Sequence, residues 1–550
     1  MRSGGKVTLG DALSPEMRAR MAQLRDDLER RARETVKKQM EQPKAPRQMQ
    51  AGPSKAAPRF RSQASTEVPR IPAKPEAVPK ILVGKGKLSS LIDQLRPRAL
   101  VPKPEIHKES FSFWELPPEA TVREPAPTAI SVRDRSDFEN VLSSGLNNTG
   151  WESGEEIFAT IGLDFGTSTT KVIVRFPYEP GIPTIAIPAP PHCRSMAHPY
   201  LWQTVLWMDG SGAFTAWPED NATLLYSLKQ GIVGHHANTA IAPNRQDGLN
   251  LTRGDAATAF LAFVVRYTRG WLFTNRAEMF RRRRPVWFIN VGLPAANMDD
   301  GPLVSTYRRI VAAAMLLGSF QGPVTAETTR LFLTNRDVLA AARSSDEGEK
   351  LGISVLPETA AEVAGFAKST NSAPGLYLMV DVGAMTLDVC AFRLVQYPSM
   401  DDLYSLFAAQ VRPLGVESYH WFLGRGKTEN EFVQQCDLCL RQVVWGTKKN
   451  RDPNAECWKK GSNLPVFLAG GGARNLLHRR VVETLDPWLR QYSQNEGTRI
   501  LELPTPANID LPVAVSNFGR LAVAWGLSYP QAKSVGFSHL RQSKIRSHRQ

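Results

Sequence analysis

One segment of this chain combines residue types that suit the binding of a phosphate chain through a metal ion. An apolar run from Phe158 to Leu163 leads into Asp164, and a glycine and three hydroxyl side chains follow in the order Gly166, Thr167, Ser168 and Thr169. A carboxylate repels phosphate, so Asp164 would act through Mg²⁺, a hard cation that prefers oxygen ligands. Backbone N–H groups and hydroxyls of the turn would contact the phosphate oxygens. We expect a strand, a phosphate-binding turn and a returning strand, although this segment alone is equally typical of an ordinary hairpin.

The same arrangement occurs a second time, much later in the chain. An apolar run from Leu376 to Val380 leads into a further set of small, hydroxyl and acidic residues, namely Asp381, Gly383, Ala384, Thr386 and Asp388. Two such hairpins predict two lobes that face one ligand, with carboxylates that converge on a single metal ion.

Two other segments fit between and after these hairpins. The apolar run Leu464 to Ala469 leads into three glycines, Gly470, Gly471 and Gly472, and then into Arg474 at the start of an expected helix. Glycines allow the backbone to approach a flat group, and a helix start offers unpaired N–H donors. The segment from Leu356 to Gly365 reads as a helix of small residues with Glu358 in its first turn, packed tightly against another helix.

In this order, the four segments resemble the actin-like ATPase superfamily, and within it the nucleotide-binding domain of the seventy-kilodalton heat-shock proteins (DnaK type). Further stretches resemble the same family: Tyr226 to Gly234, Val291 to Ala295, Pro413 to Glu417 and Ala522 to Gly526. The resemblance covers roughly residues 157 to 530.

This resemblance implies an α/β actin-like ATPase fold, with two ribonuclease-H-like lobes around a central nucleotide cleft. It implies that Asp164 and Asp381 hold the waters of Mg²⁺ and orient the attacking water, that Glu358 lies near the metal, and that Thr386 lies next to the γ-phosphate of ATP. Phosphoryl transfer requires charge neutralisation and in-line placement more than covalent chemistry, so such a set is sufficient in kind. The implied ATP- or ADP-binding residues are Gly166, Thr167, Ser168, Thr169, Gly383, Ala384, Asp388, Gly415, Gly470, Gly471, Gly472 and Arg474.

The chain departs from the family in several places. Ala384 and Met385 stand where the second hairpin usually has glycines, which would affect hydrolysis more than binding. No counterpart of the family's catalytic lysine is assigned; Lys171, seven residues after Asp164, is the candidate for the missing charge. The stretch between Gly415 and Leu464 is short, so the fourth subdomain is expected to be reduced to one or two helices. We also expect the family's C-terminal substrate-binding domain to be absent.

The expected organisation has five parts. Residues 1–150 form a basic, proline-rich, mostly disordered extension with an amphipathic helix at 14–41; residues 157–375 form ATPase lobe I; residues 376–516 form lobe II; residues 517–530 form a closing helix between the lobes; and residues 531–550 form a basic tail.

Composition constrains the environment and the partners. The formal net charge is +15, and the basic excess is concentrated near the two ends of the chain. Such ends could bind nucleic acid, an acidic protein or anionic lipid, but no interleaved aromatic residues support nucleic acid. No apolar run is long enough for a membrane span and no secretory signal is evident, so we expect a cytoplasmic protein. The five cysteines fit a reducing compartment. Cys436, Cys439 and Cys457 with His420 form an alternative zinc site, against the simpler reading of thiols packed in helices.

The leading functional hypothesis is a heat-shock-70-like ATPase that acts as an ATP- and Mg²⁺-dependent conformational switch for a protein partner, bound through the N-terminal extension. Three alternatives remain open: an actin-like filament-forming ATPase, a sugar-kinase-like phosphotransferase, and a nucleotide-sensing scaffold that does not hydrolyse ATP.

Overall fold

The computed structural model describes residues 130–146, 155–195, 198–219, 221–241, 251–294, 300–367, 372–395, 403–515 and 518–530. The chain divides into two units, Met1–Lys103 and Pro104–Gln550, and every described residue belongs to the second unit. The amphipathic helix expected at 14–41 and the basic tail at 531–550 lie outside the described residues.

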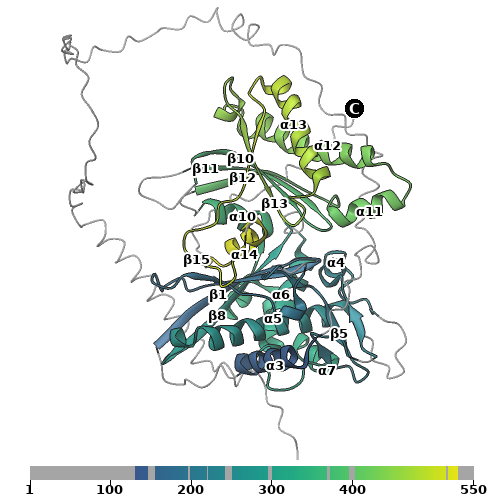
Figure 1. Ribbon diagram of the computed structural model, residues 1–550, viewed down its shortest axis with the longest axis vertical. Coiled ribbons are helices and arrows are strands. Elements are labelled where there is room, and N and C mark those ends of the chain that lie inside the picture. Colours follow the sequence, from purple (N-terminus) through teal and green to yellow (C-terminus); the bar gives the residue numbers. More distant parts are fainter. Residues whose placement is uncertain are drawn as a thin grey trace, which may run out of the picture. The chain divides into compact units, whose positions relative to one another are not determined.

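Two β-sheets share one strand order (Figure 1). The first sheet runs β15 (Ile509–Asp510), β3 (Thr184–Ala186), β2 (Thr169–Arg175), β1 (Glu155–Phe165), β8 (Arg283–Leu293) and β9 (Ile353–Pro357), with β4 (Trp202–Gln203) paired to β2. The second runs β12 (Leu403–Arg412), β11 (Leu387–Val395), β10 (Gly375–Val382), β13 (Leu464–Ala469) and β14 (Thr498–Leu501).

In each sheet, three consecutive strands pair antiparallel and the next two join in parallel. Strand β1 pairs antiparallel with β2 and parallel with β8. Strand β10 likewise pairs antiparallel with β11 and parallel with β13. The chain therefore contains the same topology twice, and β1 and β10 are the central strands of the two copies. A separate three-stranded sheet consists of β5 (Leu206–Met208) between β6 (Phe214–Thr215) and β7 (Thr223–Leu225).

Helices account for most of the remaining described residues. Those before the second sheet are α3 (Val132–Leu146), α4 (Leu228–Val233), α5 (Arg253–Asn275), α6 (Gly301–Leu317), α7 (Ala326–Leu333), α8 (Arg336–Arg343), α9 (Ser345–Lys350) and α10 (Glu358–Ala367). Those after its first strands are α11 (Val416–Gly424), α12 (Glu429–Asn450), α13 (Leu476–Ser493) and α14 (Ala522–Leu527). Short 3₁₀ helices are η4 (Pro191–Cys193), η5 (Ala277–Phe280), η7 (Glu456–Trp458) and η8 (Phe518–Leu521).

Local sequence explains the long helices. Helix α5 begins with a capping box in which the Thr252 hydroxyl accepts a hydrogen bond from the Asp255 amide and the Asp255 carboxylate accepts one from the Thr252 amide. Nineteen of its 23 residues are buried, as in a helix enclosed on all sides. Buried Arg266 on α5 donates to the carbonyls of Leu317 and Phe320, so it satisfies acceptors at the C-terminal end of α6.

Helices α10 and α14 join the cores of the two sheets (Figure 1). One hydrophobic cluster contains Ile173 of the first sheet, Met379 of the second, Val363 of α10 and Trp525 of α14. The two helices approach so closely that a Cβ atom at Gly526 would lie 1.6 Å from the Ala361 carbonyl oxygen. The small-residue segment thus packs tightly against another helix, as the sequence predicts.

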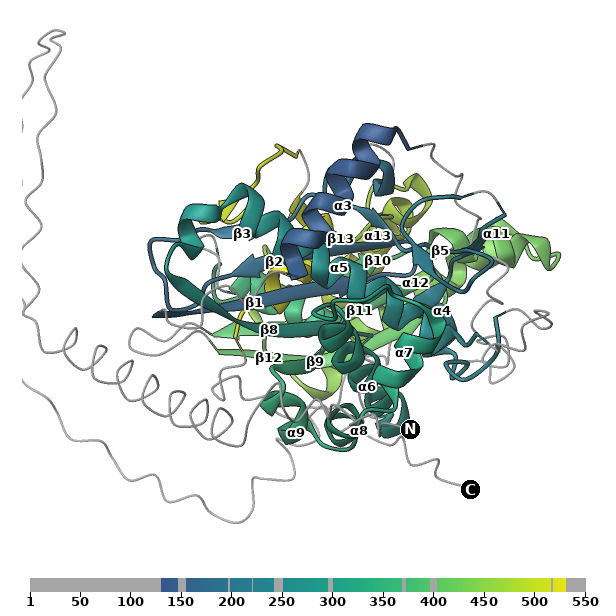
Figure 2. The ribbon, with the colours of Figure 1, turned by 90° about the horizontal axis from the view of Figure 1, so that it is seen from below.

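Helix α3 was not predicted. It lies within the region expected to be a disordered extension, yet it packs along α5 (Figure 2). Phe138 is 3% exposed and lies among the rings of Trp202, Trp217 and Tyr267. Only three residues of α3 are buried, which explains why its apolar pattern is weak in the sequence.

Candidate functional site

The first predicted hairpin is formed by β1 and β2. Asp164 lies directly opposite Lys171 across the two strands, and the Lys171 ammonium is 2.9 Å from the Asp164 carboxylate. Both side chains are largely buried, so this pair is more than a surface ion pair. The Gly166 carbonyl accepts a hydrogen bond from the Thr204 hydroxyl, which supports the turn from behind. Of the predicted phosphate-contacting hydroxyls, Ser168 is exposed, Thr167 is half-buried and Thr169 is buried in β2.

The second predicted hairpin is formed by β10 and β11. Asp381 lies directly opposite Asp388, so two acids face each other where the first hairpin has an acid and a lysine. The Thr386 hydroxyl donates a long hydrogen bond of 3.4 Å to one Asp388 oxygen, and the other Asp388 oxygen is buried without a hydrogen-bond partner. Burial, the Asp381 charge and the Glu358 charge raise the pKa of Asp388 well above its ordinary value.

The acids of the two hairpins act on each other electrostatically. Burial and then the charges of Asp164 and Glu358 raise the pKa of Asp381 to about 7, against the opposing effect of the lysines. Asp381 Oδ1 is also buried without a hydrogen-bond partner. The sequence-predicted carboxylates therefore gather in one region of the fold.

A buried ion pair, Lys229 with Glu358, lies beside these acids. The Lys229 ammonium is 2.5 Å from Glu358 Oε1, and both residues are at most 8% exposed. Burial lowers the pKa of Lys229, but the charges of Glu358, Tyr307 and Asp164 and the hydrogen bond to Glu358 together outweigh this, and the net pKa is raised. Space for Glu358 comes from Gly292 on β8, where a Cβ atom would lie 2.6 Å from Glu358 Cγ. Lys229 was not identified as a site residue in the sequence, although it lies in the family-like stretch from Tyr226 to Gly234.

Two more buried polar residues of the site were missed. Glu362, one helical turn after Glu358, is 1% exposed, and both its carboxylate oxygens lack a hydrogen-bond partner. Burial and the charges of Asp381, Asp164 and Asp388 raise its pKa well above the ordinary value. The Tyr307 hydroxyl on α6 is buried without a partner, and it feels the charges of Lys229 and Glu358. A single acid among alanines, such as Glu362, is only a weak indication of a site residue in the sequence. Nothing in the sequence around Tyr307 indicates that it belongs to the site.

The turn of the second hairpin is tied to the start of α11. The amides of Val416 and Glu417 donate to the carbonyls of Gly383 and Ala384, and the Gly415 amide donates to the Met385 carbonyl. These first donors of α11 are therefore already used within the protein. The Met385 side chain is 3% exposed, so it occupies the core, and only Ala384 adds a side chain to the half-exposed part of the turn.

The glycine turn after β13 lies against the end of β10. Gly470 has a φ of +83°, and a Cβ atom there would lie 1.9 Å from Asp381 Oδ1. Position 470 therefore requires glycine for both backbone conformation and space. Arg474 is exposed, and helix α13 begins two residues later at Leu476. The Asn475 side chain caps the amides of Leu477 and His478, so these donors are not free, contrary to the expectation of unpaired donors at the helix start.

The alternative zinc site is not formed by the described residues. Cys436, Cys439 and Cys457 are buried in the apolar core of the second sheet, where burial raises the pKa of Cys439 and Cys457 to about 12. His420 lies exposed on α11. In the described parts of the chain, no three His, Cys, Asp or Glu side chains are grouped so as to hold a metal ion directly.

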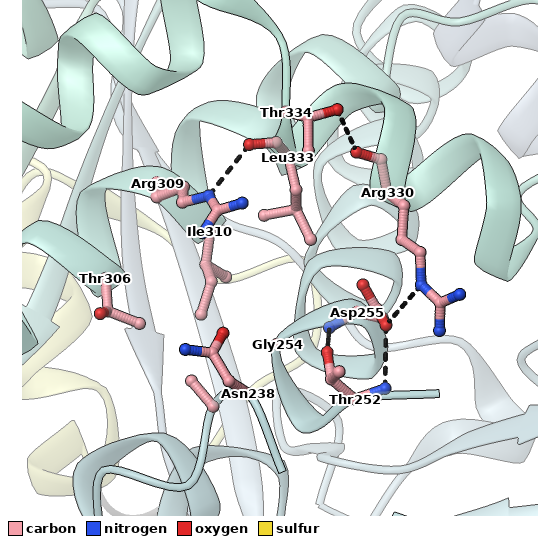
Figure 3. A pocket seen from close by; sticks show the side chains of 11 residues that line it. Asn238, Thr252, Gly254, Asp255, Thr306, Arg309, Ile310, Arg330, Leu333 and Thr334 are labelled. Atoms are coloured by element: carbon pink, nitrogen blue, oxygen red, sulfur yellow. Dashed lines mark hydrogen bonds and ion pairs between the residues drawn. The ribbon is translucent and has the colours of Figure 1, made fainter. Parts of the chain in front are cut away.

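A pocket of about 240 Å³ lies elsewhere, where α5, α6 and α7 meet (Figure 3). Arg330 Nε contacts the Asp255 carboxylate at 3.1 Å, and Arg309 Nε donates to the Leu333 carbonyl. None of the sequence-predicted site residues lines this pocket.

Comparisons with known proteins do not establish a family for this chain. No protein-family profile matches the chain, and no curated protein matches it. Among solved structures, the chain is similar to MreB5 of Spiroplasma citri bound to ADP, with 11% sequence identity over 68% of this chain and 94% of that chain. The TM-score of 0.29 is too low to establish a common fold. In the described part of the chain, no helix is long and apolar enough to cross a membrane.

Proposed function

We propose that this protein is an actin-like ATPase that binds ATP or ADP with Mg²⁺ between its two hairpins. The observation that carries the proposal is the convergence of Asp164, Asp381 and Glu358, three acids from separate segments: the charges of Asp164 and Glu358 raise the pKa of Asp381, and the charge of Asp164 raises that of Glu358. The repeated strand order of the two sheets supports the same proposal, because a duplicated topology delivers equivalent hairpins to one ligand.

The donor set fits a magnesium ion held through water. Buried carboxyl oxygens of Asp381 and Asp388 have no partner in the described structure. Mg²⁺ prefers oxygen ligands, keeps several waters and would offset the mutual repulsion of these acids. When bound, Mg²⁺ would supply charge neutralisation for the phosphate chain.

Different residues of the chain then stabilise charge, accept a proton and contact phosphate during hydrolysis. Lys229 and Lys171 each carry a positive charge next to a site carboxylate and stabilise negative charge that develops on a transferred phosphoryl group. Asp381, a buried carboxylate with one unpartnered oxygen, is suited to accept a proton from an attacking water molecule. Thr386 and the turn at Gly166 to Thr169 contact phosphate oxygens, and Gly470 to Gly472 leave room for the nucleotide.

The α10–α14 contact offers a route from the site to the rest of the protein. Glu358 begins α10, and α10 packs tightly on α14 at Ala361 and Gly526. A shift of Glu358 on nucleotide turnover would move this contact and be read by a protein partner, as in a heat-shock-70-like switch. An ATPase that forms actin-like filaments would use the same site. Sedimentation of the protein with ATP, with ADP and without nucleotide distinguishes a filament former, which pellets, from a conformational switch, which does not.

The direct test is magnesium-dependent nucleotide binding and hydrolysis by the full chain. We expect Asp381→Asn to reduce hydrolysis by about 100-fold or more while nucleotide binding is partly retained. Lys427→Gln, at an exposed ion pair on the surface, is the matched control and should leave both unchanged. Binding that does not require Mg²⁺ and is insensitive to Asp381→Asn would contradict the proposal. Hydrolysis by the wild-type protein would exclude a purely sensing scaffold, and sugar-dependent ATP consumption would indicate a kinase.

A further inference from the structure

Arg520 lies over the glycine turn of the candidate site. It belongs to η8, immediately before α14, and a Cβ atom at Gly471 would lie 3.0 Å from Arg520 Nη2. Any residue other than glycine at position 471 would therefore press on this guanidinium. Gly471 is itself exposed, so the guanidinium borders the open side of the turn.

No partner in the described structure balances the charge of Arg520. Its Nε is buried without a hydrogen-bond partner, and no carboxylate forms an ion pair with its guanidinium within the described residues. Burial and the positive charge of Arg474 lower the pKa of Arg520. A half-buried arginine beside a second cation is unfavourable unless an anion joins them.

The charges of Arg520, Arg474 and Lys171 all act on His198. Burial and then these three charges lower the pKa of His198 to about 4, so its imidazole is neutral at neutral pH and adds no cation. Lys171, from the β1–β2 hairpin, is paired with Asp164. Arg474, after the glycine turn, and Arg520, in η8, are the two cations of this group that form no ion pair among the described residues. Two such cations from separate segments indicate a bound anion with more than one charge.

We propose that Arg520 binds the phosphate chain of the nucleotide, together with Arg474, at the glycine turn. The choice of ligand rests on the proposed function, whereas the need for a multiply charged anion rests on the basic cluster itself. Arg520 directly precedes the helix that packs on α10, so phosphate contact at Arg520 would also fix the position of α14. Arginine suits this role because its planar guanidinium donates two parallel hydrogen bonds to phosphate.

The test compares ligands that do and do not carry phosphate. Isothermal titration of the full chain with Mg-ADP, adenosine and inorganic pyrophosphate is carried out for wild type, Arg520→Gln and Arg520→Lys. We expect Arg520→Gln to weaken ADP and pyrophosphate binding by about tenfold or more and to leave adenosine binding unchanged, because charge-assisted hydrogen bonds to phosphate are lost. Arg520→Lys should retain part of the affinity. Arg479→Gln, at an exposed arginine of α13 that pairs with Glu483, is the matched control.

A second variant covers the case in which Arg520→Gln does not fold. Gly471→Ala places a methyl group against Arg520 Nη2 and should weaken pyrophosphate binding by displacing the guanidinium. Equal losses for ADP and adenosine would assign Arg520 a structural role, and unchanged ADP and pyrophosphate binding would overturn the inference. If wild type binds pyrophosphate through Arg520 but binds no adenosine or ADP, the proposed function fails and the anion site stands. If it binds none of the three, both fail.

Discussion

A Cβ atom at Gly526 would lie only 1.6 Å from the carbonyl oxygen of Ala361, so α14 and α10 cross with their backbones in contact. This crossing joins the segment that begins with Glu358 to the segment that follows Arg520. Its close approach makes the helix pair sensitive to the smallest added side chain.

We expect Gly526→Ala to destabilise the protein by about 1–3 kcal/mol, because the added methyl group forces the helices apart. Urea unfolding monitored by circular dichroism measures the change. Gly446→Ala in α12, where no other atom lies within 4 Å of the added carbon, should instead be neutral or slightly stabilising. Equal effects of the two variants would show that the α10–α14 contact is not as close as described.

Removing one partner of the Lys229–Glu358 pair should be costly. Lys229→Met leaves the Glu358 carboxylate buried and unpaired, and we expect a loss of about 3–5 kcal/mol of unfolding free energy. The double variant Lys229→Met/Glu358→Gln should recover much of this stability and still lack ATP hydrolysis. Lys350→Met, which breaks an exposed pair with Glu347, provides the control and should change stability by less than about 1 kcal/mol. A double variant no more stable than Lys229→Met would contradict the buried-pair description.

Glu362 gives a pH-dependent prediction. The folded-state pKa of its carboxyl is raised well above the ordinary 4.5, mainly by burial. Between these two values the folded protein holds a proton that the unfolded chain has released, so this group makes folding less favourable as pH rises. Glu362→Gln removes the effect, and we expect the ligand-free variant to exceed wild type by about 1–3 kcal/mol at pH 8 and by less at pH 5. Urea unfolding at both pH values measures this, with exposed Glu483→Gln as the control; an advantage independent of pH would contradict it.

Two glycines with the same backbone conformation allow the effect of backbone strain to be measured separately from the effect of steric crowding. Gly470 and Gly461 have φ values of +83° and +82°, but only at Gly470 would a Cβ atom meet Asp381. Each alanine variant should cost about 1–2 kcal/mol through backbone strain. We expect Gly470→Ala to lose magnesium-nucleotide binding as well, measured by titration calorimetry, whereas Gly461→Ala should bind as wild type does. Loss of binding in both variants would point to strain rather than to the carboxylate.

Features encoded within a few consecutive residues were predictable from the sequence. The two hairpins, the glycine turn and the small-residue helix each have a local pattern of apolar runs and glycines, and the structure forms β1–β2, β10–β11, the turn after β13 and α10 there. One local prediction was wrong in detail: the amides at the start of α13, expected to be unpaired, are capped by the Asn475 side chain.

Features that depend on distant residues could not be predicted. Lys229 becomes a site residue only because α4 is brought to Glu358, 129 positions later in the chain. Arg520 reaches the glycine turn only through the packing of η8. Helix α3 depends on the aromatic rings around Phe138, which come from distant parts of the chain and leave no trace in its own sequence. Whether the predicted residues bind nucleotide stays a prediction.

The two hairpins have the same strand pairing, but they differ in the charge of the residue that faces the aspartate. Each has an aspartate paired across the strands with the residue seven positions later, which is Lys171 in the first hairpin and Asp388 in the second. The first pair has an acid and a base, and the second has two acids that repel each other when both are ionised. Mg²⁺ would therefore be held more strongly by the second hairpin than by the first. The two copies of the topology would thus form a binding site whose two sides differ in charge.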